Sequence, residues 1–309
     1  MGIQHGSDGC SMGEEVIVYP LEVVAALFGS LVGSFLNVVA LRTITGESLS
    51  HPPSHCPRCL HPIRWFDNIP LFSWLLLVGK CRDCRGRISP AYPITEAVTA
   101  LWAGAVVSLG LPFVPSLLHF GAGASLIAAA RVDFATTLLP RKLLLFSLGS
   151  LLLLALAEAD SLSSLGWRLQ GVLVVAGALA LVRFLFSRWM GREAMGGGDV
   201  ELGVVIGFWL GAAGGGLALG VAVVTGAGAG AIWAWISHKE KDGGVGLELP
   251  WGPFLVGGAF LSLLGGETLQ TIFETGRDTL LDHRQIVLPI SLLLLFWMGR
   301  RLVAIKNRT

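Results

Sequence analysis

Charged side chains are scarce in this sequence. Only 14% of its 309 residues are charged and 53% are hydrophobic, whereas soluble domains carry about 25% charged residues. The mean hydropathy is +0.69. This shortage of charge excludes an ordinary soluble protein, and the long apolar blocks at 93–182 and 202–236 predict membrane-spanning helices.

Two further absences narrow the class of protein. The first 15 residues are acidic rather than basic, so a cleaved signal peptide is not expected. No G-x-G-x-x-G segment follows a strand pattern, so the sequence shows no sign of a soluble-type cofactor fold. The glycines of "GAGAGA" (226–231) are interpreted as helix packing rather than a nucleotide loop. No nucleic-acid partner is expected.

The hydrophobic segments predict an all-α polytopic membrane protein with about eight or nine transmembrane helices. The segment 200–213 is short for a span, because about 21 Å of helix does not cross roughly 30 Å of hydrocarbon. It is predicted to be a short or re-entrant helix. The predicted spans are 16–41, 93–110, 113–131, 142–157, 167–187, 200–213, 214–236, 251–265 and 285–303.

The basic residues are distributed very unevenly between the two sides of the predicted membrane. With the amino terminus outside, all lysines and arginines except Arg168, Arg277 and Arg284 fall in cytoplasmic segments. The positive-inside rule therefore predicts this orientation. The cytoplasmic segments are 42–92, 131–142, 183–193, 237–250 and 300–309.

The longest polar segment, 42–92, carries "CPRC" at 56–59 and "CRDC" at 81–84. Two C-x-x-C pairs at this separation match a tetrathiolate zinc site formed by Cys56, Cys59, Cys81 and Cys84. A pair of disulfides is the alternative, and the predicted cytoplasmic location disfavours it. Four thiolates leave no open position for water, so the zinc is expected to be structural.

Other candidate ligands near the first pair are interpreted differently. His51, His55 and His61 flank the first C-x-x-C pair and are expected to be polar loop residues rather than ligands. The fifth cysteine, Cys10, is expected on the opposite side of the membrane and outside the metal site.

Two aspartates lie at the cytoplasmic edge of the predicted spans. Asp133 ends the third span in "RVDFATTLLP", and Asp199 begins the sixth in "GGGDVEL". Ionisable residues at membrane depth are functional candidates by default. Two neighbouring carboxyl groups can share a proton, with one acting on water as a base and the other as an acid. Spacing alone leaves three alternatives open: an aspartyl protease, a proton relay in a transporter, and ordinary interfacial residues.

The sequence resembles the type IV prepilin peptidases, bacterial membrane aspartyl proteases, in five blocks that occur in the same order. The blocks are "GSFLNVVALR" (33–42), the cysteine segment 56–96, "VDFATTLLP" (132–140), "GGGD" (196–199) and "LPWGPFL" (249–255). The resemblance implies that Asp133 and Asp199 are catalytic and that the enzyme cuts a short basic leader just after a glycine. It also implies N-methylation of the new amino terminus from S-adenosylmethionine. The alternative function is that of a membrane transporter with a zinc loop, in which the two aspartates couple transport to ions.

The resemblance also sets expectations for partners and location. The implied substrates are prepilins of a type IV pilus or pseudopilins of type II secretion, and the implied location is the bacterial inner membrane, with the active site facing the cytoplasm. Glu96 matches a family position; a cofactor role and a buried carboxylate paired with a loop arginine are equally acceptable for it. The expected domains are 1–41, a cysteine loop at 42–92, a peptidase core at 93–265 and an extra segment at 266–309.

The sequence departs from the family pattern beside each aspartate. Glu201 stands where the family usually has lysine, and Arg141 stands where it often has aspartate. Glu201 is expected to weaken contact with an acidic substrate group or to disfavour ionisation of Asp199. The helix dipole predicts Asp199, at a helix amino end, as the base and Asp133, at a carboxyl end, as the acid.

Overall fold

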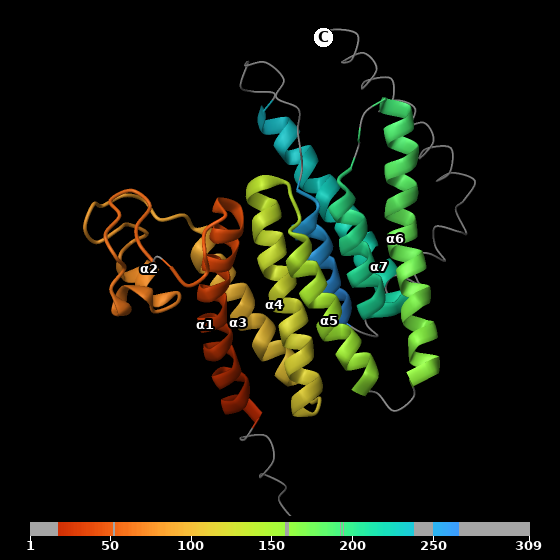
Figure 1. The fold of residues 1–309 in the computed structure, drawn as a ribbon, viewed down its shortest axis with the longest axis horizontal. Helices are drawn as coiled ribbons and strands as arrows, with labels where there is room; N and C mark the ends of the chain where they lie inside the picture. Colours follow the sequence, from red (N-terminus) through yellow and green to blue (C-terminus); the bar gives the residue numbers. More distant parts are fainter. Residues whose placement is uncertain are drawn as a thin grey trace, which may run out of the picture. The chain divides into compact units, whose positions relative to one another are not determined.

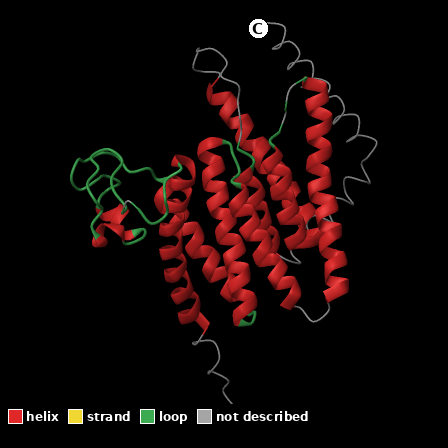
Figure 2. Ribbon diagram, in the orientation of Figure 1, coloured by secondary structure: helices red, strands yellow, loops and turns green. Residues whose placement is uncertain are grey.

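The computed structural model describes residues 18–51, 53–157, 161–191, 193, 195–237 and 250–265. All regular structure in these residues is helical (Figure 2). The chain divides into a unit at Met1–Leu264 and a second unit at Gly265–Thr309. The predicted last span at 285–303 and Cys10 therefore lie outside the described residues, as does the segment 266–309.

The helices of the bundle follow one another with short connections, except for the long cysteine loop between the first two of them (Figure 1). The elements are α1 (Val18–Thr45), the 3-10 helix η1 (Trp65–Asn68), α2 (Phe72–Leu76), α3 (Ala91–Ser108), α4 (Phe113–Thr136), α5 (Arg141–Ala157), α6 (Ser161–Met190) and α7 (Gly197–Ser237). A further short helix spans Gly252–Gly265. The bundle is packed through α1 against α3 and α4, α4 against α3 and α5, and α7 against α5 and α6.

Four helical segments are long and apolar enough to cross a membrane. They are Leu21–Thr45, Phe113–Thr136, Ser163–Trp189 and Gly197–Ile232. Helices α3 and α5 coincide with the predicted spans 93–110 and 142–157, but they do not reach the same combination of length and hydropathy. The all-helical membrane fold is confirmed, whereas the predicted count of eight or nine spans is not.

Helix α7 is interrupted at Gly211, whose φ of 66° and ψ of −168° are not helical. A straight helix would separate Gly207 from Gly215 by about 12 Å along its axis. However, a β-carbon added at Gly215 would lie only 3.6 Å from the α-carbon of Gly207. The chain therefore folds back at Gly211, and the predicted segments 200–213 and 214–236 are two separate helical arms, with the turn slightly earlier than predicted.

Helices α1 and α3 approach closely at two glycines one helical turn apart. A β-carbon at Gly29 would lie 2.6 Å from the Thr99 carbonyl oxygen, and one at Gly33 would lie 2.7 Å from the Glu96 α-carbon. Small residues at this spacing allow membrane helices to pack backbone to backbone. The contact places the buried Glu96 carboxyl group directly beside α1.

Aromatic rings join the centre of the bundle. Trp102 of α3 stacks on Phe260 of the helix 252–265 with ring centroids 4.3 Å apart. It also meets Trp209 of α7 edge to face at 5.6 Å. Trp209 donates its indole N–H to His119 of α4 at 3.0 Å. These contacts thus join α3, α4, α7 and the helix 252–265 to one another.

Candidate active site

Asp133 lies in the last turn of α4 and is only 3% exposed. Its Oδ2 accepts a hydrogen bond of 2.8 Å from the backbone N–H of Gly252. Gly252 is the first residue of the helix 252–265, and a β-carbon there would lie 2.7 Å from Oδ2. The "LPWGPFL" block therefore serves the site through a backbone donor, and a residue larger than glycine at position 252 would displace Asp133.

Asp199 is the third residue of α7 and is 9% exposed. Its carboxylate accepts the backbone N–H of Gly196, the residue just before the helix. A side chain at the third helical position that reaches back to the capping residue satisfies one of the unpaired donors of the first turn. This confirms the prediction that Asp199 begins the helix with its carboxylate at the free N–H groups.

The two aspartates come from α4 and α7 and are brought together at one end of the bundle. Asp133 is close enough to Asp199 for their charges to interact. The α4–α5 turn supports this arrangement, because a β-carbon on Gly198 would lie 2.9 Å from that of Leu139. Both carboxyl groups are buried and each is oriented by a backbone donor.

The predicted environment of Asp133 is wrong in one respect. Asp133 does lie near the carboxyl end of α4, but its carboxylate contacts the amino end of the helix 252–265. The dipole of that helix favours the ionised form, as the dipole of α7 does for Asp199. Helix dipoles therefore give no reason to assign the base to one aspartate and the acid to the other.

Arg141 and Glu201, the two residues that depart from the family pattern, pair with each other. Arg141, the first residue of α5, makes a bidentate hydrogen-bonded ion pair with Glu201 of α7, with its Nε 3.1 Å from both carboxylate oxygens. Glu201 therefore has a cationic partner beside Asp199. Sequence reasoning identified both residues but did not connect them, although their opposite charges were a visible signal.

A second cation, Arg183 of α6, also lies near the α7 amino end. Its charge interacts with Asp199, and its Nη2 is 3.2 Å from Glu193. A β-carbon on Gly197 would lie 3.0 Å from Arg183 Nη1. Sequence analysis did not single out this arginine, because only the fold brings residue 183 to the start of α7.

The four cysteines of the loop converge. The sulfur atoms of Cys56, Cys59, Cys81 and Cys84 all lie within 4.8 Å of one another, and no histidine or carboxylate joins the group among the described residues. The sulfurs of Cys56 and Cys84 are 3.9 Å apart. Tetrahedral coordination with Zn–S bonds of about 2.3 Å would separate sulfurs by about 3.8 Å, so the donor set fits zinc.

The two C-x-x-C turns have the same backbone structure. In the first, Cys56 N–H donates to the His61 carbonyl and Leu60 N–H to the Cys56 carbonyl; in the second, Cys81 N–H donates to Gly86 and Arg85 N–H to Cys81. The residue after each second cysteine, Leu60 or Arg85, has a left-handed φ of 61° or 57°. Each turn therefore directs its two sulfur atoms toward a common point.

An ion pair between the second turn and the segment before it holds the loop together. Arg82 makes a bidentate pair with Asp67, with Nη2 2.6 Å from Oδ1, and its guanidinium lies 5.4 Å from the centre of the Phe66 ring. The hydrogen bond from Arg82 lowers the pKa of Asp67 below its ordinary value. His55 hydrogen-bonds the Pro53 carbonyl, consistent with a polar loop residue.

Glu96 is buried, but it is not paired with a loop arginine, and that alternative is wrong. Its Oε2 accepts the backbone N–H of Leu71 at 2.7 Å, and the hydroxyl of Ser34 also bonds to its carboxylate. Leu71 has a left-handed φ of 62°. The carboxylate thus joins α3, α1 and the cysteine loop at one point.

These features define a class of protein: a helical multi-pass membrane protein with a tetracysteine loop and a buried pair of carboxyl groups. Comparison with known proteins shows which family has these features. Residues 27–109 match the model of the bacterial peptidase A24 N-terminal domain, and residues 120–231 match that of the type IV leader peptidase family.

Curated relatives match about four fifths of this chain and more than nine tenths of their own length. The type 4 prepilin-like proteins leader peptide-processing enzyme of Escherichia coli O78:H11 is 35% identical over 82% of this chain and 97% of its own. Prepilin leader peptidase/N-methyltransferases of Pseudomonas aeruginosa and Stutzerimonas stutzeri are each 33% identical, over 81% and 79% of this chain and 93% and 91% of their own. No solved structure matches. The chain belongs to the type IV leader peptidase family.

Proposed function

We propose that this protein is a membrane aspartyl endopeptidase that removes the leader from type IV prepilins or pseudopilins, with Asp133 and Asp199 as the catalytic pair. The observation that carries the proposal is the meeting of these two buried carboxyl groups, which lie on α4 and α7 and interact with each other. The names of the relatives support the choice of substrate.

The pair can catalyse peptide hydrolysis without a nucleophilic side chain. Two adjacent buried carboxyl groups favour a state that holds a single proton. The ionised carboxylate takes a proton from water as the water oxygen attacks the peptide carbonyl, and the protonated carboxyl gives its proton to the carbonyl oxygen. When the C–N bond breaks, the leaving amine takes up a proton. The N–H groups of Gly252 and Gly196 orient the two carboxyl groups throughout.

The cysteine loop is proposed to hold one zinc ion through Cys56, Cys59, Cys81 and Cys84. The convergence of the four sulfurs within 4.8 Å of one another supports this assignment. With all four positions taken by thiolates, the ion would supply folding energy rather than chemistry.

The proposed location is the bacterial inner membrane, with the carboxyl pair and the cysteine loop on the cytoplasmic side. The uneven distribution of basic residues supports this orientation. N-methylation of the new amino terminus from S-adenosylmethionine is proposed as a second activity, because relatives of similar length are named N-methyltransferases as well as peptidases.

Incubation of the purified protein in detergent with a prepilin peptide tests the peptidase assignment. Asp133→Asn and Asp199→Asn should each lower the cleavage rate by about 10²–10⁴-fold, because each removes one proton-transfer group. The double variant should be no worse than the poorer single variant, since the two residues act as a unit.

Glu22→Gln is the matched control, since this carboxylate lies near the start of α1 and bonds Ser108. It should cleave as the unchanged protein does. Near-normal cleavage by Asp133→Asn would remove that residue from the site. An unchanged protein that leaves the leader attached would favour the transporter instead.

A further inference from the structure

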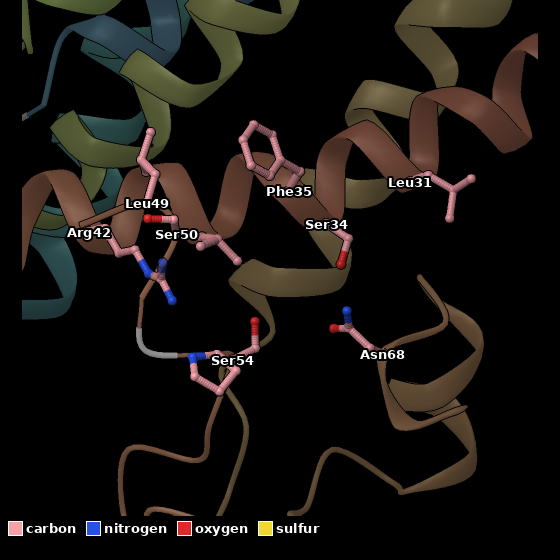
Figure 3. Close-up of a pocket in the computed structure, with 10 residues that line it drawn as sticks. Leu31, Ser34, Phe35, Arg42, Leu49, Ser50, Ser54 and Asn68 are labelled. Atoms are coloured by element: carbon pink, nitrogen blue, oxygen red, sulfur yellow. The ribbon is translucent and has the colours of Figure 1, made fainter. Parts of the chain in front are cut away.

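A cavity lies between α1 and the cysteine loop, apart from the carboxyl pair (Figure 3). Its volume of about 350 Å³ falls within the range of roughly 300–1,000 Å³ that is usual for small-molecule sites. Residues of one face of α1 form one wall, and the loop forms the other. The lining residues are Leu31, Ser34, Phe35, Val38, Arg42, Leu49, Ser50, Pro53, Ser54 and Asn68.

Polar groups from separate elements converge on this cavity. Figure 3 shows the Arg42 guanidinium near Ser50 and Ser54, and the Ser34 hydroxyl and Asn68 amide on the other side. Arg42 is only 6% exposed, and its Nη1 is held by a 2.6 Å hydrogen bond to the Ser48 carbonyl. A buried guanidinium fixed in this way is a site for a carboxylate or phosphate group.

A buried carboxyl group lies behind the opposite wall. Ser34 bonds the buried Glu96 carboxylate, which the Leu71 N–H also orients. One end of the cavity therefore offers a cation and the other lies beside a carboxyl group whose oxygens accept hydrogen bonds, with apolar side chains between them. This arrangement fits a small amphipathic molecule that carries both a carboxylate and a positive charge.

We propose that this cavity binds the methyl donor S-adenosylmethionine, with Arg42 binding its carboxylate and the Ser34–Glu96 side facing its positive sulfonium. The inference rests on the methyltransferase activity proposed above. When bound, the donor supplies a methyl group: an N–C bond forms at the free amine, an S–C bond breaks to leave a neutral thioether, and the amine releases one proton. Arg42 and Glu96 act here by binding and orienting, not by transferring that proton.

Equilibrium binding of tritiated S-adenosylmethionine to the full-length protein in detergent tests this assignment. Arg42→Ala should weaken binding at least tenfold, because it removes the carboxylate partner. Ser54→Phe should abolish binding by filling the cavity from the loop side. The matched controls are Arg188→Ala, an exposed arginine near the end of α6, and Thr43→Phe, an exposed neighbour on α1. Both should bind as the unchanged protein does.

Decarboxylated S-adenosylmethionine separates a direct contact from a structural effect of Arg42. The unchanged protein should bind this analogue about as weakly as the Arg42→Ala variant binds the complete donor. The Arg42→Ala variant should no longer distinguish the two ligands. If it still prefers the complete donor to the same extent, Arg42 does not bind the carboxylate.

Three outcomes overturn the inference while leaving the peptidase intact. The first is leader cleavage by a preparation that does not bind the donor. The second is donor binding that neither Arg42→Ala nor Ser54→Phe changes, although both variants keep their zinc and thermal stability. The third is an anionic phospholipid that the unchanged protein retains and the two variants lose in native mass spectrometry, with no binding of the donor. The cavity would then be a lipid headgroup site. Failure of the unchanged protein to cleave the leader would instead contradict the proposed function itself.

Discussion

The two residues near the aspartates that differ from the family pattern, Arg141 and Glu201, carry opposite charges and pair with each other. Arg141 follows the turn after Asp133, and Glu201 lies two residues after Asp199 in the same first turns of α7. Their side chains are 73% and 37% exposed, so the ion pair contributes little to stability, about 0.2–1 kcal/mol. Its effect is positional, because it ties the start of α5 to the helix end that carries Asp199.

Reversing one charge of this pair should therefore slow cleavage. Glu201→Arg places two cations together and should lower kcat by about tenfold to a hundredfold, since small misplacements of catalytic groups are costly. The exchanged pair Arg141→Glu with Glu201→Arg should recover most of that loss. The measurements are kcat and KM on a prepilin peptide.

Glu47→Arg provides the control for added positive charge, because Glu47 is exposed and lies in the segment after α1, away from the carboxyl pair. A double variant as slow as Glu201→Arg alone would show that Glu201 acts on the substrate rather than through Arg141.

Sequence reasoning at this scale succeeds where chemistry is local. The four cysteines could be predicted because a C-x-x-C turn brings its own two sulfur atoms together. The Gly252 donor to Asp133 and the Arg141–Glu201 pair could not, because each depends on how distant helices pack. The sequence gives residue types at these positions but not their partners.

The cysteine loop folds as two turns of the same kind, and zinc is expected to hold them together. Purified protein should contain one zinc ion per chain, and serine at any of Cys56, Cys59, Cys81 or Cys84 should release it. Because metal binding supplies folding energy to such a module, these variants should lose loop order first. Cleavage should decrease less than methylation, since the carboxyl pair lies on other helices.

Metal content by mass spectrometry, with limited proteolysis of the loop, tests this prediction. Cys10→Ser is the control and should keep the metal. An ordered, protease-resistant loop without metal would contradict a structural role for zinc.

The folded-back helix α7 depends on Gly211. Its φ and ψ lie in a region that is essentially restricted to glycine, and a β-carbon there would collide with the Trp167 indole, including Nε1 at 2.6 Å. Gly211→Ala should therefore lower the free energy of unfolding by at least about 1–3 kcal/mol.

Thermal unfolding in detergent measures the effect of Gly211→Ala. Gly216→Ala, in the following arm, is the matched control because nothing lies within 4 Å of its added β-carbon. This control should be neutral or slightly stabilising. Equal stability of the two variants would contradict a turn at Gly211.

Hydropathy could predict most helices of this chain but not their relation to one another. It placed a boundary inside 200–236 because two apolar segments adjoin there, and the backbone turns a few residues earlier. The turn itself has little hydropathy signal, since glycines occur on both sides of it. Packing against the Trp167 indole distinguishes Gly211 from the other glycines of α7.

At the scale of the whole molecule, the orientation in the membrane decides where cleavage takes place. Helix α4 has 24 residues, enough to cover about 36 Å and cross the hydrocarbon core. Phe113 begins it, and Leu138 follows its end, the end that carries Asp133; their side chains are 80% and 70% exposed. Arg131, Arg141 and Lys142 gather at the Leu138 end. The positive-inside rule therefore predicts that this end faces the cytoplasm.

Labelling of intact cells with a membrane-impermeant maleimide tests the orientation directly. In a Cys10→Ser background, Phe113→Cys should react from outside, whereas Leu138→Cys should react only after the inner membrane is permeabilised. The zinc-bound thiolates of the loop should stay unlabelled in both cases, because they are ligated and are predicted to be cytoplasmic. Reaction of Leu138→Cys in intact cells would reverse the orientation and place the carboxyl pair on the outer side. A cytoplasmic Leu138 would place leader cleavage on the side where the basic leader of a newly made prepilin is expected to remain, because the positive-inside rule disfavours its translocation.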